Sequence, residues 1–152
     1  MAFKRSLKDY GKDVIHMVKV MMGLKGSGKT KQLLEMVQDA VESEQGDIVY
    51  IEKSSKLIHD IPLKVRLVDA SQYDFNDYDF LKGFICGLYS ANYDITHIFI
   101  DSILKIIEKD YNDETDEFLQ WCEKFGSKEN IKFTITVSTD SSKATSAIKK
   151  FF

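Results

Sequence analysis

Eight consecutive residues have the types and the spacing of a phosphate-binding loop. They form the stretch GLKGSGKT, which matches G-x-x-x-x-G-K-[ST] in full. Glycines adopt backbone dihedrals that other residues avoid, so successive N–H groups could close around phosphate oxygens. The lysine would reach the β- and γ-phosphates of a nucleoside triphosphate, and the threonine hydroxyl would ligate Mg²⁺. We expect the whole loop to bind the triphosphate: Gly23, Leu24, Lys25, Gly26, Ser27, Gly28, Lys29 and Thr30.

A candidate acidic partner for the metal follows a hydrophobic stretch later in the chain. A triphosphate site of this kind needs a carboxylate at the end of a neighbouring strand, and the segment IFID ends in Asp101. The apolar residues before it predict a buried strand. We therefore expect Thr30 and Asp101 to hold Mg²⁺, directly or through water, and Lys29 and Asp101 to take part in any phosphoryl chemistry.

The two motifs together resemble those of the P-loop NTPase superfamily. The wider pattern is similar to short stand-alone bacterial P-loop proteins of unassigned function, sometimes labelled ATP-binding or twitching motility proteins. It includes VIHMV before the loop, IVYIE after the loop's helix, GFICG, and the strand that ends in Asp101. The resemblance implies the P-loop fold and binding of a nucleoside triphosphate. ATP is the expected nucleotide, because the guanine-specific motif N-K-x-D does not occur.

A group that orients the attacking water is less evident. In superfamily members that hydrolyse ATP rapidly, a glutamate often follows the metal-side aspartate, but Ser102 occupies that position here. Our first candidate is Glu52, which closes the strand IVYIE, and our second is Asp69, which closes VRLVD. A solvated carboxylate at a strand–loop junction is the alternative for both. Ser138 or Thr139 would sense the γ-phosphate or, for Thr139, cap a helix.

Arginine is scarce, which bears on the reaction class. Only Arg5 and Arg66 occur, whereas phosphoryl-transfer enzymes commonly stabilise transition-state charge with an arginine. Either Arg66 or a lysine such as Lys25 fills this role, a neighbouring subunit or partner supplies the charge, or turnover is slow. The lack of a lid-like segment with paired arginines argues against a small-molecule kinase.

Alternating strand and helix patterns predict the fold. Strands are expected at 14–22, 47–52, 64–69, 95–101 and 131–138, and helices at 29–44, 80–90, 103–109, 114–124 and after residue 140. Right-handed crossovers between such units produce a parallel sheet covered on both faces. We predict a single-domain, three-layer α/β/α sandwich with a mostly parallel sheet of about five strands over residues 14–152. A basic N-terminal segment, 1–13, precedes it.

Several residues carry more local expectations. Cys86 and Cys122 lie in apolar helical patterns and are expected in the core. The four-residue spacing of Gly83 and Gly87 would let a helix approach the sheet closely. His97 lies in a strand pattern, which favours a core histidine over a ligand. Four aromatic residues would shelter an adenine ring, dock a partner, or anchor the next helix: Tyr73, Phe75, Tyr78 and Phe80. The terminal Phe151 and Phe152 would be core or an association patch.

Composition limits the partners. The 152 residues are 43% hydrophobic, with a net charge of −3 and a pI of about 5.6. No nucleic-acid partner is expected from this charge. No apolar run reaches the roughly 18 residues of a membrane span, so we expect a cytoplasmic protein. The favoured function is an ATP-binding protein and slow or partner-stimulated Mg²⁺-dependent ATPase. A nucleotide-dependent switch without catalysis is the alternative, and a kinase is a third possibility.

Overall fold

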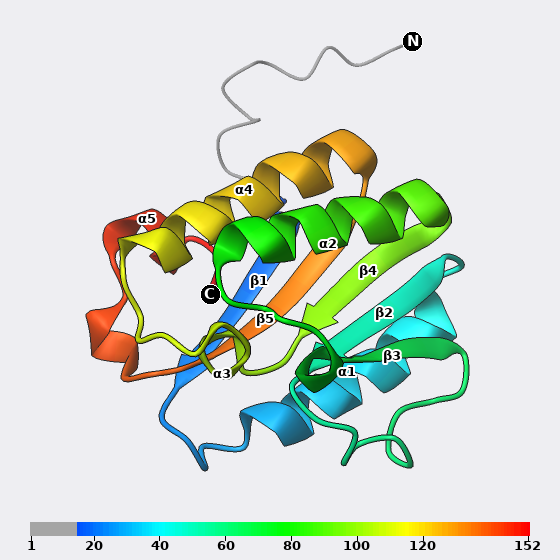
Figure 1. Ribbon diagram of the computed structural model, residues 1–152, viewed down its shortest axis with the longest axis horizontal. Coiled ribbons are helices and arrows are strands. Elements are labelled where there is room, and N and C mark those ends of the chain that lie inside the picture. The colour runs from blue at the N-terminus through cyan, green and yellow to red at the C-terminus, as the bar shows by residue number, and fades with distance from the viewer. Residues whose placement is uncertain (1–14) are drawn as a thin grey trace, which may run out of the picture.

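Five parallel strands form the central sheet of the computed structural model, which describes residues 15–152 (Figure 1). The expected basic segment 1–13 and residue Val14 lie outside this range. The strands are β1 (Val18–Gly23), β2 (Asp47–Glu52), β3 (Val65–Asp69), β4 (Ile95–Ile100) and β5 (Lys132–Ser138). They pair in the order β1-β5-β4-β2-β3, with every pairing parallel. The predicted α/β fold is confirmed, although the first strand begins at Val18.

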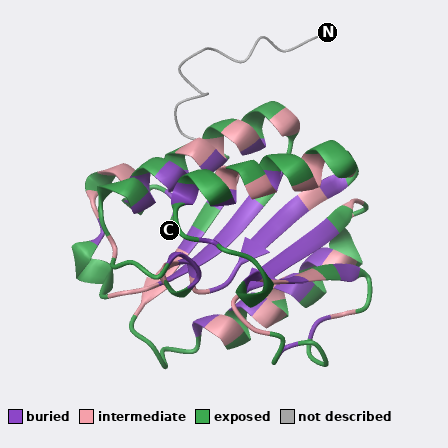
Figure 2. Ribbon diagram, in the orientation of Figure 1, coloured by how far each residue is buried: buried purple, intermediate pink, exposed green. Residues whose placement is uncertain are grey.

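Helices cover both faces of the sheet and complete three layers (Figures 1 and 2). α1 (Lys29–Ser43) packs on one face through a cluster that includes Leu33 and Tyr50. α2 (Tyr78–Ala91) and α4 (Asp113–Glu129) pack on the other face through a larger cluster that includes Leu81 and Phe118. Shorter elements are η1 (Ala70–Gln72), α3 (Ile103–Ile107), η2 (Ser141–Lys143) and α5 (Ser146–Lys149).

Burial on both faces explains why the central strands are almost continuously apolar. Along β4, Phe99 contacts the α1 layer, whereas Ile98 and Ile100 contact the α2 and α4 layer. The same alternation places Tyr50 of β2 on the α1 side.

The strand order corrects one expectation and supports another. β5 lies between β1 and β4, so Asp101 does not end a strand next to the one that carries the loop. The crossovers nevertheless bring the carboxyl ends of all the strands to one edge of the sheet. β2 lies beside β4, so Glu52, the first candidate for orienting the water, ends the strand adjacent to the one that Asp101 follows.

Two helix predictions were wrong in instructive ways. α4 continues past residue 124, where the helix was expected to end, and runs to Glu129, with Asn130 as its C-cap at φ 57°. Gly126 is buried inside α4, and a Cβ there would lie 2.3 Å from the carbonyl oxygen of Ile131. Gly83 and Gly87 instead face outward, with nothing within 4 Å of an added Cβ. Close approach to the sheet therefore depends on Gly126.

The remaining expectations for the core are confirmed only in part. Cys122 is buried, but Cys86 is exposed on the outer face of α2. The expected C-terminal helix is broken into η2 and α5, and these segments bury Ala144, Ile148 and Phe151. The backbone carbonyl of Phe151 also accepts a hydrogen bond from the Val20 N–H at 2.8 Å. Because its side chain is buried as well, Phe151 belongs to the core.

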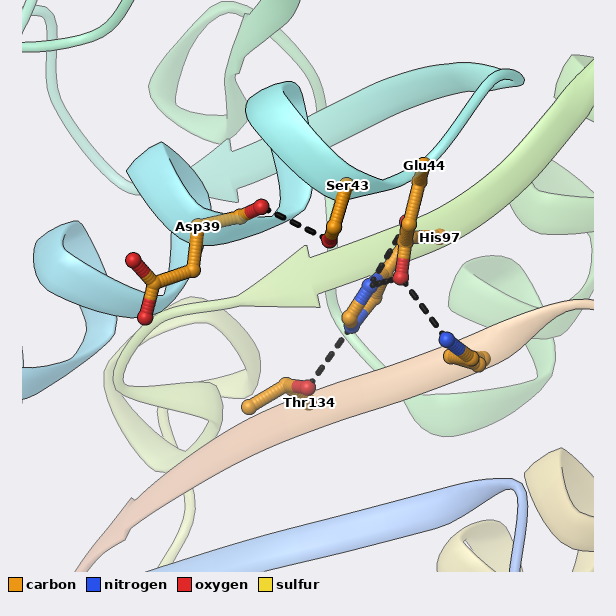
Figure 3. Close-up of polar contacts among 6 residues, drawn as sticks. Asp39, Ser43, Glu44, His97 and Thr134 are labelled. Atoms are coloured by element: carbon orange, nitrogen blue, oxygen red, sulfur yellow. Dashed lines mark hydrogen bonds and ion pairs between the residues drawn. The ribbon is translucent and has the colours of Figure 1, made fainter.

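A polar network at the amino end of the sheet holds the end of α1 (Figure 3). His97 bonds through Nδ1 to Glu44 Oε1 at 3.0 Å and through Nε2 to Thr134 Oγ1 at 2.8 Å. Lys132 donates to the same Glu44 oxygen at 2.9 Å. The ring of His97 stacks on Phe99 with the centroids 4.0 Å apart. The buried histidine is thus a satisfied core residue, as expected.

Candidate nucleotide-binding site

The loop between β1 and α1 has the curled backbone that the sequence predicted. Gly26 and Gly28 have φ values of 86° and 83°, in the left-handed region that favours glycine. The N–H of Ser27 donates to the carbonyl of Leu24 at 3.2 Å and closes the turn. Gly28 is the N-cap of α1, which begins at Lys29. The loop thus bends back on itself and enters the helix directly.

The amino end of α1 is suited to an anion. No side chain caps it, and its first turn contains no acidic residue. The other long helices differ, because Asp77 caps α2 and Asn112 caps α4 in a capping box. The first N–H groups of a helix need acceptors, and its dipole places positive potential there. Phosphate oxygens would supply the acceptors that α1 does not obtain from its own side chains.

Lys29 lies across the inside of the loop. Its Nζ donates to the carbonyl of Leu24 at 2.8 Å and to Oγ of Ser27 at 3.1 Å. The residue is only 9% exposed. Burial lowers the pKa of the lysine, and the nearby Asp101 acts in the opposite direction. The ammonium is therefore aimed into the curve of the loop, where a phosphate would lie.

Asp101 collects hydroxyl groups from four segments of the chain. Thr30 donates to its Oδ2 at 3.1 Å and Tyr50 donates to the same oxygen at 2.9 Å. Thr136 donates to Oδ1 at 2.8 Å, and Ser102 lies 3.3 Å from that atom. The predicted proximity of Thr30 and Asp101 is present in the structure, even though β5 lies between the strands that precede them.

Three of these partners were missed by the sequence reasoning. Tyr50 and Thr136 are fully buried within apolar strands. Because buried hydroxyls require hydrogen-bond partners, their residue types were an available signal. Burial raises the pKa of Tyr50, and Asp101 raises it further, which keeps the phenol a donor. Ser102 adopts φ 55°, unusual for a residue other than glycine, and its N–H donates to Thr136 Oγ1 at 2.7 Å. Composition gave no signal for that conformation.

The donor set fits Mg²⁺. This ion prefers oxygen ligands and is usually held by one or two carboxylates together with substrate phosphates and waters. Asp101 is 3% exposed and supplies a carboxylate, while the Thr30 hydroxyl lies beside it at the start of α1. When bound, the ion would offset phosphate charge; Thr30 and Asp101 are the residues that would hold it.

Glu52 is a buried carboxylate with one oxygen unsatisfied. It is 6% exposed, and Oε1 accepts from Ser54 Oγ at 2.9 Å. Within the described residues its Oε2 has no hydrogen-bond partner. Burial raises the pKa of Glu52 and Asp101 adds to the rise, whereas Ser54, Lys56 and Lys105 oppose it. An orphaned buried oxygen of this kind would bind a water molecule.

A cavity of about 800 Å³ opens in front of the loop. The loop and the start of α1 form one wall, and α3 with the residues after it forms the other. The first wall contains Lys25, Gly26, Gly28, Lys29, Thr30 and Lys31, and the second contains Ser102, Leu104, Lys105, Glu108, Lys109 and Asp110; Lys56 and Ser138 complete the lining. The lining contains six lysines against two acidic residues, Glu108 and Asp110, and this positive excess suits a polyanionic ligand.

Asp101 and Glu52 are not among the residues that line this cavity, and the same holds for three other candidates. Arg66 lies within β3 at the far edge of the sheet from β1. Asp69 is occupied as the cap of η1, where it accepts from the N–H of Ser71 at 2.9 Å. Thr139 does not line the cavity, and Asp140 is the cap of η2. Among the three, none is placed to contact a phosphate held by the loop.

Of the four aromatic residues around the start of α2, two belong to the core, whereas Tyr73 and Phe80 are exposed. Phe75 and Tyr78 are buried, and Phe75 contacts the rings of Phe80 and Phe84 with centroids 5.0 Å apart. None of the four predicted aromatic residues lines the cavity. They therefore anchor α2, and the alternative of an adenine shelter at these side chains is not supported.

Comparison with known proteins adds little beyond this geometry. No protein family model and no curated protein matches the sequence. Among solved structures, the chain is similar to the flagellar accessory protein FlaH from Methanocaldococcus jannaschii, at 16% sequence identity with a TM-score of 0.48. That alignment covers 98% of this chain and 73% of FlaH. Strand, curled loop and helix together define a P-loop-like α/β fold in this chain.

No helix in residues 15–152 is both long enough and apolar enough to cross a membrane.

Proposed function

We propose that this protein binds Mg²⁺ and ATP at the loop Gly23–Thr30 and hydrolyses the nucleotide slowly. The observation that supports this most strongly is the junction of the curled loop with the uncapped start of α1, beside the contact of Thr30 with Asp101. Residues of the loop, Lys29 and Thr30 line one cavity, and the carboxylate of Asp101 accepts a hydrogen bond from Thr30 at 3.1 Å. These are the parts that a triphosphate site requires.

The residues divide the work by chemistry. The loop amides and Lys29 bind the phosphates and neutralise their charge. Tyr50 and Thr136 orient the carboxylate of Asp101 through their hydrogen bonds. Glu52 holds the attacking water through its free Oε2 and accepts the proton that the water releases.

A nucleotide titration tests the proposal. ATP, GTP, CTP and UTP are titrated into the wild-type protein and into Lys29→Ala, with and without Mg²⁺. We expect ATP to bind, Mg²⁺ to strengthen the binding, and Lys29→Ala to weaken it by about tenfold or more, since a charge-assisted hydrogen bond is worth roughly 1.5–3 kcal/mol. ATP affinities that are equal in the two proteins would refute the site.

A nucleotide-dependent switch is the second candidate, and one observation favours it. α3 is bracketed by two non-glycine residues in the left-handed region, Ser102 at φ 55° and Glu108 at φ 60°. Such residues concentrate in switch regions, where a bound ligand biases the backbone. Both residues line the cavity. Tight Mg-ATP binding without turnover above that of Lys29→Ala would favour this candidate over the ATPase.

A further inference from the structure

The source of positive charge for the proposed hydrolysis is left open by the scarcity of arginine. Arg66 is remote from the cavity, and Lys25 and Lys31 lie on the same wall as the loop that grips the phosphates. Charge that develops as the γ-phosphate leaves needs a cation on the opposite side, facing the loop. The α3 wall of the cavity contains two lysines, and Lys56 lies beside it.

Ion pairing distinguishes these lysines. Lys109 lies 3.6 Å from Glu114, and the neighbouring Lys53 is paired with Glu108. Within residues 15–152, Lys56 and Lys105 form no ion pair with a carboxylate. Both lie near enough to Glu52 to lower the pKa of its carboxyl against the effect of burial. Two lysines without an ion-pair partner in this range therefore line the cavity, Lys56 and Lys105.

Lys105 is the better anchored of the two. It lies on α3, four residues beyond Asp101, and its N–H donates to the carbonyl of Ser102 at 3.0 Å. Ile103, Ile106 and Ile107 bury the opposite side of this helix almost completely. The exposed Lys105 is thereby directed away from the core, toward the cavity. Lys56 instead lies in the irregular segment after β2.

We propose that Lys105 supplies, within the same chain, the positive charge that hydrolases of this kind commonly take from an arginine. The inference rests on the proposed ATP hydrolysis and deepens it. The water oxygen forms a bond to the γ-phosphorus, and the bond from that phosphorus to the β–γ bridging oxygen breaks. Its electron pair remains on ADP, and the proton of the water passes to Glu52 and then to solvent. Lys105 offsets the negative charge that gathers on the phosphate oxygens.

Turnover and binding measured separately test this role. We expect Lys105→Ala to lower kcat by about 100-fold, as removal of a transition-state donor does, while changing the Kd for Mg-ATP by less than about fivefold. Lys105→Arg should restore most of the rate, and ADP with aluminium fluoride should bind Lys105→Ala less tightly than wild type. Lys128→Ala, which removes an exposed charge on α4, should match wild type. An unchanged kcat in Lys105→Ala would overturn the inference.

A mixing experiment separates a cation within the chain from one lent by a second copy. Lys29→Ala retains Lys105, and Lys105→Ala retains the loop, so a cation acting between chains would restore activity when the two are combined. We expect no recovery. Recovery would overturn the inference while leaving the proposed ATPase intact. Wild-type turnover no higher than that of Lys29→Ala would overturn both.

Discussion

Asp101 illustrates how single residues shape this site. Its carboxylate accepts hydroxyls from Thr30, Tyr50 and Thr136, which lie on α1, β2 and β5. Each donor fixes one direction of approach, so the carboxylate is oriented before any metal arrives. Such supporting groups commonly affect metal affinity by 10- to 100-fold. The orientation of Asp101 is therefore as much a property of its neighbours as of its own position.

Glu52→Gln separates function from stability at the residue scale. We expect kcat to fall by about 100-fold or more, because the amide accepts no proton. The folded state raises the pKa of Glu52, so it retains the proton to higher pH than the unfolded chain does. Ionised Glu52 therefore lowers the stability of the folded state. This cost is full above the folded pKa and disappears as pH falls toward the lower, unfolded pKa. At neutral pH, thermal unfolding should show a Tm equal to or above that of wild type.

The control for this variant is Glu42→Gln, an exposed carboxylate on α1. It should change neither kcat nor Tm. A large drop in the Tm of Glu52→Gln, or unchanged turnover, would contradict the role assigned to Glu52.

The residues predicted from the sequence were those whose types have few other uses. Gly26, Gly28, Lys29 and Thr30 form a pattern that encodes a backbone shape, and the structure has that shape. Arg66 was a candidate cation only because the chain contains so few arginines, and the number of arginines does not show where in the fold one of them lies. Tyr50 could not be ranked before the strand order was known, because its role depends on β2 lying beside β4.

At the scale of elements, the close contact between α4 and the sheet depends on Gly126. Gly126→Ala places a methyl group 2.3 Å from the carbonyl of Ile131, and backbone atoms there cannot move aside. Overpacking of this kind costs roughly 1–3 kcal/mol. We expect the free energy of unfolding in urea to fall by about 2 kcal/mol.

Gly83→Ala is the matched control. It lies inside α2 but has open space around an added Cβ. Alanine favours helix over glycine by roughly 0.5–1 kcal/mol, so this variant should be somewhat more stable than wild type. A stabilising Gly126→Ala would show that α4 packs differently.

The existence of the elements was more predictable than their ends. Short apolar runs with β-branched residues, separated by helical patterns, indicated the strands, because strands buried on both faces are almost continuously apolar. The end of α4 was predicted too early, at residue 124, because a glycine that stops a helix and one that packs inside it, as Gly126 does, look the same in a sequence. The prediction that Cys86 is buried was also wrong. The outer face of α2 is itself rich in small and apolar residues, so the sequence pattern does not distinguish it from the buried face.

At the scale of the whole molecule, the pH dependence of stability should report His97. Burial lowers the pKa of this histidine, although Glu44 opposes the shift; Lys132, Thr134 and Phe99 are its other neighbours. The unfolded chain therefore binds the proton more readily near pH 6.5. The stability that the neutral ring contributes is full above the unfolded pKa and is lost as pH falls toward the folded pKa.

Denaturant unfolding between pH 8 and pH 5 tests this expectation. His97→Gln should lower the stability at pH 8 and flatten its decline toward pH 5. His59→Gln, at an exposed histidine, should leave the profile of the wild type unchanged. An identical pH profile in His97→Gln would contradict the assignment.

The parallel topology is what assembles the site. Loop, Asp101, Glu52 and Ser138 come from four separate stretches of the chain, and all lie where strands end at the same edge of the sheet. For the same reason, the lysines of the loop and α1 line the same cavity as the lysines on and after α3. Local sequence patterns indicated the individual site residues, but only the strand order shows which of these residues lie near each other.

Amide NMR tests the central claim most directly, because the claim concerns the backbone N–H groups of the loop. In ¹⁵N-labelled protein titrated with Mg-ATP, the amide protons of Gly28, Lys29 and Thr30 should move downfield as they donate to phosphate oxygens. The same titration of Lys29→Ala should require much more nucleotide. Amide resonances of the loop that stay unchanged at nucleotide concentrations that saturate the protein would contradict the account.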